Sequence, residues 1–290
     1  MSDLTRPDDF SLTGAANQLG HDDVASDVTG DEGPMMYARP DCPRCGGTGL
    51  LEVFQPGQLA PGTVPCQCVE VGQRLAAADK RVELLFGKGG ARMTINSFDP
   101  GSFQENQTAL EVARNYVREF DEFAKRGEGF ALQGEPGSGK THLATGVLIA
   151  LTKKRMAAGR DFKAFNLSVP EMLRLARKRF DDPNTGDVLD RAMSADLYLF
   201  DDIGAEYRRE GSEGMSWVDE QLFVILNHRL NHNLPTIYTT NLSKRELAGR
   251  LDERITSRLD RRTLAFLPMK RVRKATEPSR ERVNLLLHGK

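Results

Sequence analysis

The 290-residue sequence predicts an α/β fold, a parallel five-stranded sheet between helices, preceded by a small zinc-binding domain. Three observations lead to this prediction. From about residue 91 onward, short apolar runs alternate with helical patterns, as expected for strand–helix–strand units. One strand–helix junction carries a glycine-rich loop. All four cysteines fall in two close pairs within residues 37–70.

The first segment, residues 1–36, has eight acidic residues against the single basic Arg6. It has few large apolar residues, so it cannot bury enough surface to offset the entropy of ordering. We therefore expect a disordered acidic tail, with a short partner-binding segment as the alternative. The tail lacks the basic start and apolar stretch of a secretory signal, and the chain has no apolar run of about 18 residues, so we expect a cytoplasmic protein with no membrane partner.

The cysteines come next, in residues 37–90, which we assign to a zinc-binding domain and a linker helix. Two close thiol pairs, separated by a strand-like Leu50–Phe54, can meet at one tetrahedral Zn²⁺, and glycines after the first pair suit a tight turn. The alternatives are a redox dithiol at the first pair and, more rarely, an iron–sulfur site. The expected ligands are Cys42, Cys45, Cys66 and Cys68.

A helix is expected over residues 71–88, and Gly87, Gly89 and Gly90 then suggest a hinge between domains. Apolar residues at three- and four-residue steps predict one amphipathic helix over residues 110–124. Capping boxes mark helix starts at Ser168 and Ser243. The expected strands are Phe130–Gln133, Phe162–Leu167, Leu197–Phe200, Thr236–Thr240 and Thr263–Leu267.

The segment Gly134–Thr141 fits the phosphate-loop pattern G-x-x-x-x-G-K-[ST] between a strand and a helix. Its glycines let backbone N–H groups turn toward phosphates, and the helix dipole adds positive charge. Lys140 supplies a charge for the β- and γ-phosphates, and Thr141 a hydroxyl for Mg²⁺. The residues expected to bind ATP are Gly134, Gly137, Ser138, Gly139, Lys140, Thr141, His142 and Asp201.

Two carboxylates, Asp201 and Asp202, follow the apolar run Leu197–Phe200. Ligands in open α/β sheets bind at such strand ends, so Asp201 is the expected Mg²⁺ partner and Asp202 the group that orients or deprotonates the attacking water. Asn241 follows another strand and could bond the γ-phosphate or its water. Arg254 and Arg258 share one helix face and could reach a neighbouring subunit's nucleotide.

These segments resemble the AAA+ ATPases that load replicative helicases, the DnaC/DnaI type. The resemblance runs from about Ile95 to Leu267 and rests on four segments: Gly134–Ala144, Leu199–Glu206, Thr239–Ser243 and Arg254–Leu259. It implies an AAA+ core over residues 91–269, in which Asn241 is the first sensor and Arg258 the likelier trans-acting finger. It also implies self-association through this domain, a zinc domain that docks on a hexameric helicase, and binding of single-stranded DNA.

The sequence departs from that family in two ways. Most AAA+ proteins have Asp-Glu where this chain has Asp201-Asp202; the shorter Asp side chain suggests slow, switch-like hydrolysis. No second sensor helix is obvious, and Arg280 or Arg282 are the candidates to replace it. A transposition-helper ATPase of the IstB type and a nucleotide-dependent adaptor with little turnover are the alternative functions.

The final segment, residues 270–290, is a basic tail that begins with Lys270 and Arg271. It could bind nucleic-acid phosphates without sequence preference, or it could be simply solvated. Trp217, the only tryptophan, could stack on a single-stranded base or lie in the core.

Overall fold

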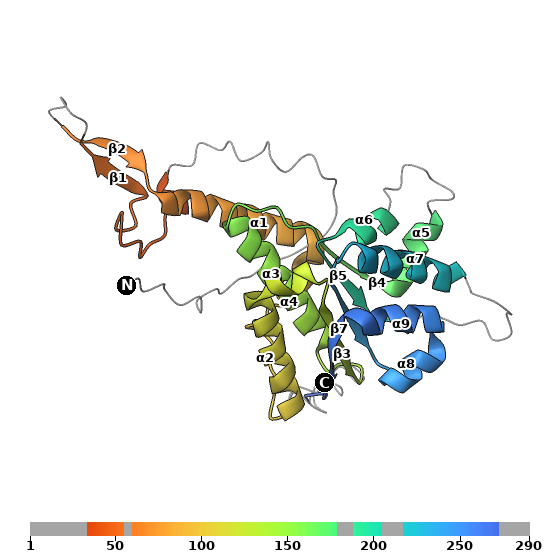
Figure 1. Cartoon of the computed structure of the whole chain (residues 1–290). Helices are drawn as coiled ribbons and strands as arrows, with labels where there is room; N and C mark the ends of the chain where they lie inside the picture. Colours follow the sequence, from red (N-terminus) through yellow and green to blue (C-terminus); the bar gives the residue numbers. More distant parts are fainter. Residues whose placement is uncertain (1–33, 55–59, 179–187, 205–216, 273–290) are drawn as a thin grey trace, which may run out of the picture.

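The computed structural model describes residues 34–54, 60–178, 188–204 and 217–272 (Figure 1). Its strands are β1 (Leu50–Val53), β2 (Gly62–Pro65), β3 (Gly129–Gly134), β4 (Ala164–Ser168), β5 (Leu197–Asp201), β6 (Thr236–Thr240) and β7 (Thr263–Met269). After a 3-10 turn at Pro34–Tyr37, its helices are α1 (Gln67–Gly90), α2 (Gln104–Arg118), α3 (Phe120–Lys125), α4 (Lys140–Ala157), α5 (Val169–Lys178), α6 (Val188–Ser194), α7 (Trp217–Asn231), α8 (Lys244–Arg250) and α9 (Glu253–Arg262).

The central sheet has five parallel strands in the order β4-β5-β6-β3-β7, which confirms the predicted fold class. Each of the five predicted apolar runs forms one of these strands. Within the central sheet, β3 comes first in sequence and lies between β6 and β7, so the phosphate loop follows an interior strand. A separate antiparallel hairpin, β1–β2, belongs to the cysteine-containing segment.

Helices cover both faces of the central sheet, because alternate side chains of each strand point to opposite faces. On β5, Leu197 and Leu199 join a core cluster with α2 and α4, whereas Tyr198 and Phe200 join a second cluster with α6, α7 and α9. Figure 1 shows α1–α4 on one side and α5–α9 on the other. The apolar runs are thus buried from both sides.

Helix α1 begins at Gln67, four residues before the predicted start, and it joins the cysteine segment to the sheet domain. Gly87 interrupts it with a φ of 67°, so the predicted break is present, but helical structure resumes to Gly90. The helix packs on α4, where Val82 contacts Ile149 and Lys153 pairs with Asp79. The second half of α1 is therefore fixed to the sheet domain.

The single helix predicted over residues 110–124 is wrong, because the structure divides it into α2 and α3 at Glu119. Lys154 of α4 explains the division. Its ammonium donates to the carbonyl oxygens of Val117 and Arg118, both at 2.8 Å. These carbonyls would otherwise accept bonds inside a continuous helix.

The region around α7 shows how polar groups support this core. Arg229 of α7 is fully buried and donates to the carbonyl oxygens of Ala192, Ala195 and Pro235, at 2.7, 2.9 and 2.6 Å. Trp217, at the start of the same helix, packs against the second core cluster, which favours its core interpretation.

The helix starts predicted at Ser168 and Ser243 are both present. Ser243 forms a complete capping box with Glu246, and Ser168 accepts the backbone N–H of Glu171 at 3.4 Å. Among the helices in the described ranges, none combines the length and apolar character needed to cross a membrane.

Candidate functional site

The phosphate loop connects strand β3 to helix α4, which confirms the predicted strand–loop–helix order. Gly139 precedes α4 with a left-handed φ of 89°, and a Cβ there would lie 2.7 Å from a ring carbon of Phe98. A Cβ on Gly134 would lie 2.2 Å from the carbonyl oxygen of Met269. Both positions therefore need glycine, and the bare backbone is what allows N–H groups to approach an anion closely.

The side chain of Lys140 turns back into this loop and is only 6% exposed. Its ammonium donates to the carbonyl oxygens of Gly134 and Glu135, at 2.7 and 3.0 Å, and to Oδ1 of Asn241 at 2.8 Å. Burial lowers the pKa of Lys140, while the two carboxylates at the end of β5 oppose that shift. A positive charge is therefore held inside the loop, close to the predicted sensor.

Ser138 provides an independent indication that the loop fits a phosphate. The residue is 3% exposed, and its Oγ has no hydrogen-bond partner among the residues that the structure describes. A buried polar atom without a partner costs about 1–3 kcal/mol. Phosphate oxygens would accept this hydroxyl, so the loop is suited to a nucleotide.

Asp201 and Thr141 lie together where β5 ends and α4 begins. The Thr141 hydroxyl donates to Oδ1 of Asp201 at 2.9 Å, and Thr239 of the neighbouring β6 donates to the same oxygen at 2.7 Å. Burial raises the pKa of Asp201, and the bonds from Thr239 and Thr141 lower it. A carboxylate beside a hydroxyl offers the oxygen ligands that Mg²⁺ takes together with phosphates, so the residues fit that ion.

Asp202 is held in a left-handed conformation, with a φ of 60°. Its backbone N–H donates to Thr239 Oγ1 at 2.8 Å, and its Oδ1 accepts the side-chain amide of Asn241 at 2.8 Å. Since Asn241 Oδ1 also accepts a hydrogen bond from the Lys140 ammonium, the Asn241 side-chain amide links Lys140 to Asp202. The structure thus brings together Lys140, Thr141, Asp201, Asp202 and Asn241.

His142, which we expected to contact the nucleotide, directs its ring toward the segment before α2. Its Nε2 lies 3.1 Å from Ser97 Oγ and 3.0 Å from the Thr94 carbonyl oxygen, and its ring meets that of Phe98 edge-on. This side chain therefore fixes residues 94–98 against the start of α4. A direct nucleotide contact by His142 stays a prediction.

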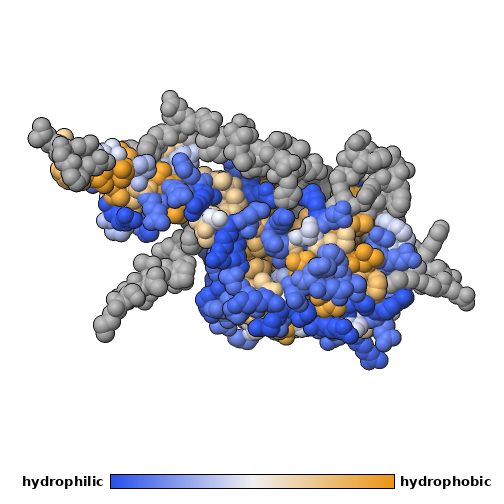
Figure 2. Space-filling view, turned by 45° about the horizontal axis from the view of Figure 1, so that its top comes forward, coloured by the Kyte–Doolittle hydropathy of each residue, from blue (hydrophilic) through white to orange (hydrophobic). Residues whose placement is uncertain are grey.

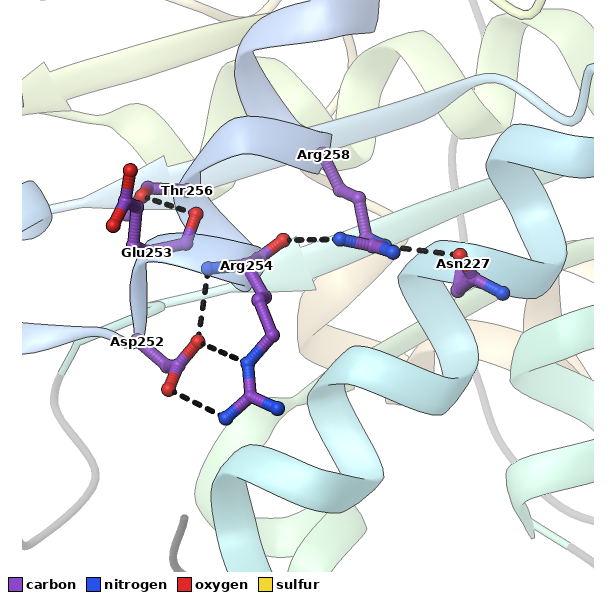
Figure 3. Close-up of polar contacts among 6 residues, drawn as sticks. All are labelled: Asn227, Asp252, Glu253, Arg254, Thr256 and Arg258. Atoms are coloured by element: carbon purple, nitrogen blue, oxygen red, sulfur yellow. Dashed lines mark hydrogen bonds and ion pairs between the residues drawn. The ribbon is translucent and has the colours of Figure 1, made fainter. Parts of the chain in front are cut away.

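Arg258 is the better prepared of the two candidate fingers (Figure 3). Its guanidinium donates to Asn227 Oδ1 at 3.0 Å and to the Arg254 carbonyl oxygen at 2.8 Å, and it lies 4.1 Å from the ring centroid of Phe223. Arg254 instead makes a bidentate pair with Asp252, at 2.9 and 3.0 Å. The charge of Arg254 is thus neutralised locally, whereas Arg258 is oriented by neutral groups.

The four cysteines form one cluster, with all four sulfur atoms within 4.8 Å of one another. Sγ atoms are 3.8 Å apart in the Cys42–Cys66 pair and 3.5 Å apart in the Cys45–Cys68 pair. A tetrahedral Zn²⁺ with bonds near 2.3 Å needs sulfur separations of roughly 3.8 Å, so the cluster fits zinc. Backbone N–H groups of Arg44 and Cys45 lower the pKa of Cys42 to about 6, which favours the thiolate that a metal needs.

Sequence reasoning missed three residues that position this machinery: Thr239, Phe223 and Asn227. Thr239 entered only as part of a strand and of the segment Thr239–Ser243, with no role of its own, and no prediction concerned Phe223 or Asn227. Of the predicted basic tail, Lys270 and Arg271 lie in the described part of the chain. Arg280 and Arg282 lie outside it, so their predicted role is not tested.

Comparisons with known proteins agree with this geometry. Replicative helicase loader DnaI of Bacillus subtilis (strain 168) is 29% identical over 134 residues, which cover 46% of this chain and 39% of DnaI. Phage-like element PBSX protein XkdC of the same strain is 27% identical over 232 residues, covering 77% of this chain and 79% of XkdC. The crystal structure of the DnaC helicase loader superposes with a TM-score of 0.54 at 25% identity, covering 63% of this chain and 100% of that one.

The chain thus spans less than two thirds of the length of DnaI. Its parallel sheet and phosphate loop are those of an AAA+ P-loop ATPase, with helicase loaders among its sequence relatives and structural neighbours. The family model described as IstB-like ATP binding protein matches residues 98–265, more than half of the chain. The chain belongs to this family of IstB-like ATP binding proteins.

Proposed function

We propose that this chain is an ATP-dependent loader of a replicative DNA helicase. The observation that carries the proposal is that one chain has both the residues suited to bind ATP and Mg²⁺ and a four-thiol cluster. Helix α1 joins the two sites. The likeness to DnaI and DnaC supports it. A protein with this role acts in the cytoplasm.

In this proposal Lys140 and Ser138 bind the phosphates of ATP, and Thr141 and Asp201 hold Mg²⁺. When bound there, Mg²⁺ would neutralise charge on the phosphates. Asp202 accepts the proton of the attacking water, and Asn241 orients that water. Hydrolysis is slow because Asp202 is short and already bonded to Asn241, so the amide must reorganise before the carboxylate can act.

The site works between subunits that associate through the ATPase domain. Arg258 reaches the γ-phosphate bound to the neighbouring copy, where a guanidinium stabilises transition-state charge. Its orientation by Phe223 and Asn227 supports this role, because less freedom is lost when the finger engages. Arg254 serves instead to bond Asp252, the residue that caps α9.

The zinc-binding domain docks on the helicase. Its surface carries large exposed side chains (Figure 2): Phe54 is 74% exposed, Val64 39% and Leu50 38%. Exposed apolar groups of this kind suit a protein partner. Single-stranded DNA is bound by the ATPase assembly, with the basic residues after 269 as candidate phosphate contacts.

The test is a pull-down with the purified cognate hexameric helicase, with and without ATP. Wild type should retain the helicase; Cys66→Ser should lose it because the docking domain loses its metal site. Lys140→Ala should still bind the helicase without nucleotide but lose any ATP effect. If wild type fails to bind the helicase under both conditions, the loader proposal fails.

Two other functions remain to be separated from loading. The family model match favours a transposition-helper ATPase of the IstB type, and binding to a cognate transposase in place of the helicase would identify that role. A nucleotide-dependent adaptor predicts ATP binding with negligible turnover. In that case Lys140→Ala and Asp202→Asn would leave the measured hydrolysis rate equally close to zero.

A further inference from the structure

One face of α4 receives residues 93–98, which lie between α1 and α2. Gly139, His142 and Gly146 are three and four residues apart, so they lie on the same side of this helix. A Cβ on Gly146 would lie 2.8 Å from the backbone nitrogen of Ile95, and one on Gly139 would meet an aromatic ring of the same segment. Residues 93–98 therefore pack directly on the helix backbone at two points, with His142 between them.

His142 makes the polar contact of this face. Its Nε2 lies 3.0 Å from the Thr94 carbonyl oxygen and 3.1 Å from Ser97 Oγ. Since a carbonyl oxygen only accepts, Nε2 carries the donor hydrogen of the ring. Ser97 Oγ in turn donates to the Arg92 carbonyl oxygen at 2.7 Å and accepts the Thr94 backbone N–H at 3.0 Å. The imidazole thus binds a turn that is closed by its own hydrogen bonds, so it positions this turn as a unit.

This turn and the metal-binding group lie on different sides of the start of α4. Thr141 and His142 are successive residues of the helix, so their side chains point about 100° apart. Thr141 bonds the carboxylate at the end of β5, and His142 bonds the turn. In the proposed function the γ-phosphate lies beside Thr141 and Asn241, because Mg²⁺ and the attacking water are bound there. The other end of the triphosphate, which carries the nucleoside, is then directed away from β5 and β6, toward residues 93–98.

We propose that His142 is a positioning residue for nucleotide binding, which acts through residues 93–98 and not on the phosphates. By holding the turn on α4, His142 keeps the Phe98 ring, which is 8% exposed, against Gly139. These residues form the wall on which the nucleoside half of ATP rests. The loop thus binds the phosphates, and the segment that His142 positions adds the affinity that depends on the nucleoside. This role deepens the ATP-binding part of the proposed function and rests on it.

The test compares the binding of ATP and of inorganic tripolyphosphate, which has the phosphates but no nucleoside, to the full chain by calorimetry. His142→Ala should weaken ATP binding roughly 3- to 10-fold, the range that a neutral hydrogen bond supplies, and leave tripolyphosphate binding unchanged. His142→Gln keeps a donor near the position of Nε2 and should recover most of the ATP affinity, whereas His142→Asn, whose amide is one methylene closer to the backbone, should not. Arg155→Ala removes a bond to Asp121 at the other end of α4; it is the matched control and should bind both ligands as wild type does.

Gly146→Ala tests the segment independently of the imidazole, since the added Cβ would displace residues 93–98 from α4, and it should show the same selective loss of ATP affinity. Equal ATP affinity of wild type and His142→Ala would overturn the inference. An equal loss for ATP and tripolyphosphate would also overturn it, since that would mean the loop itself had changed. If wild type binds neither ligand, the proposed function fails and the inference with it. If ATP binds but the helicase does not, only the loader role fails and the role of His142 stands.

Discussion

Thr239→Val tests whether the hydroxyl on β6 positions the metal-binding carboxylate. The substitution keeps the side-chain shape but removes a donor to Asp201 at 2.7 Å and an acceptor for the Asp202 N–H at 2.8 Å. Thr239 is 1% exposed, so water cannot replace either bond. We expect the free energy of unfolding to fall by about 1–3 kcal/mol, the cost of leaving buried polar groups unpaired.

The same change should weaken Mg²⁺ binding. Groups that orient a metal ligand typically contribute a factor of about 10 to 100 in metal affinity. The measurement is a Mg²⁺ titration of fluorescent-ATP binding, with stability followed by urea denaturation. We expect the midpoint of the Mg²⁺ titration to rise by about tenfold or more in Thr239→Val.

Thr240→Val is the matched control. Thr240 is also fully buried, but its hydroxyl donates to the Ile203 carbonyl oxygen at 2.8 Å and contacts neither carboxylate. It should lose comparable stability and keep the wild-type Mg²⁺ midpoint. If Thr239→Val folds and retains an unchanged midpoint, or if both variants shift it equally, the positioning argument is wrong.

Three further changes test other parts of the molecule. Phe223→Leu removes the ring under Arg258, so ATPase turnover of the assembled protein should fall about two- to fivefold at unchanged ATP affinity. Val224→Ala, at an exposed neighbouring residue, should have no effect on turnover. Equal turnover rates in Phe223→Leu and wild type would contradict the role of this ring in orienting Arg258. Cys66→Ser should reduce zinc measured by mass spectrometry from about one ion per chain to near none while ATP still binds; retained zinc would count against the four-thiol site. Arg229→Met leaves four carbonyl oxygens and the Thr236 hydroxyl without their donor. It should lower the unfolding free energy by about 3 kcal/mol in thermal denaturation, and a loss below about 1 kcal/mol would contradict this account.

The central sheet and phosphate loop could be predicted because their signals are local. Each strand is a short apolar run between helical patterns, and the loop pattern needs only eight consecutive residues, Gly134–Thr141. The carboxylates at the end of β5 and Asn241 after β6 were found because polar residues at strand ends are informative in a parallel sheet. Their meeting in the structure follows from β5 and β6 being neighbours.

The missed features depend on contacts between distant segments. Apolar spacing continues through Glu119, so nothing local predicts that Lys154 ends α2 there. Thr239 is a common strand residue, and only the register of β5 and β6 turns its hydroxyl toward Asp201. Arg271 was read as part of a basic run, because its place over Gly137 depends on how β7 pairs with β3.

The contact between α1 and α4 connects the phosphate loop mechanically to the cysteine cluster. The 18-residue α4 is about 27 Å long, and its first turn carries Lys140 and Thr141. Near its other end, Lys153 forms an ion pair with Asp79 of α1. The far end of α1 begins at the cysteine cluster, with Cys66 as its cap. From Gln67 to Asp79, where it meets Lys153, α1 is about 18 Å long, so a tilt of roughly 5° there moves its tip by roughly 1.6 Å. We therefore expect spin labels at residues 54 and 114 to change separation when ATP binds; a constant distance would mean that the arm does not respond to the nucleotide.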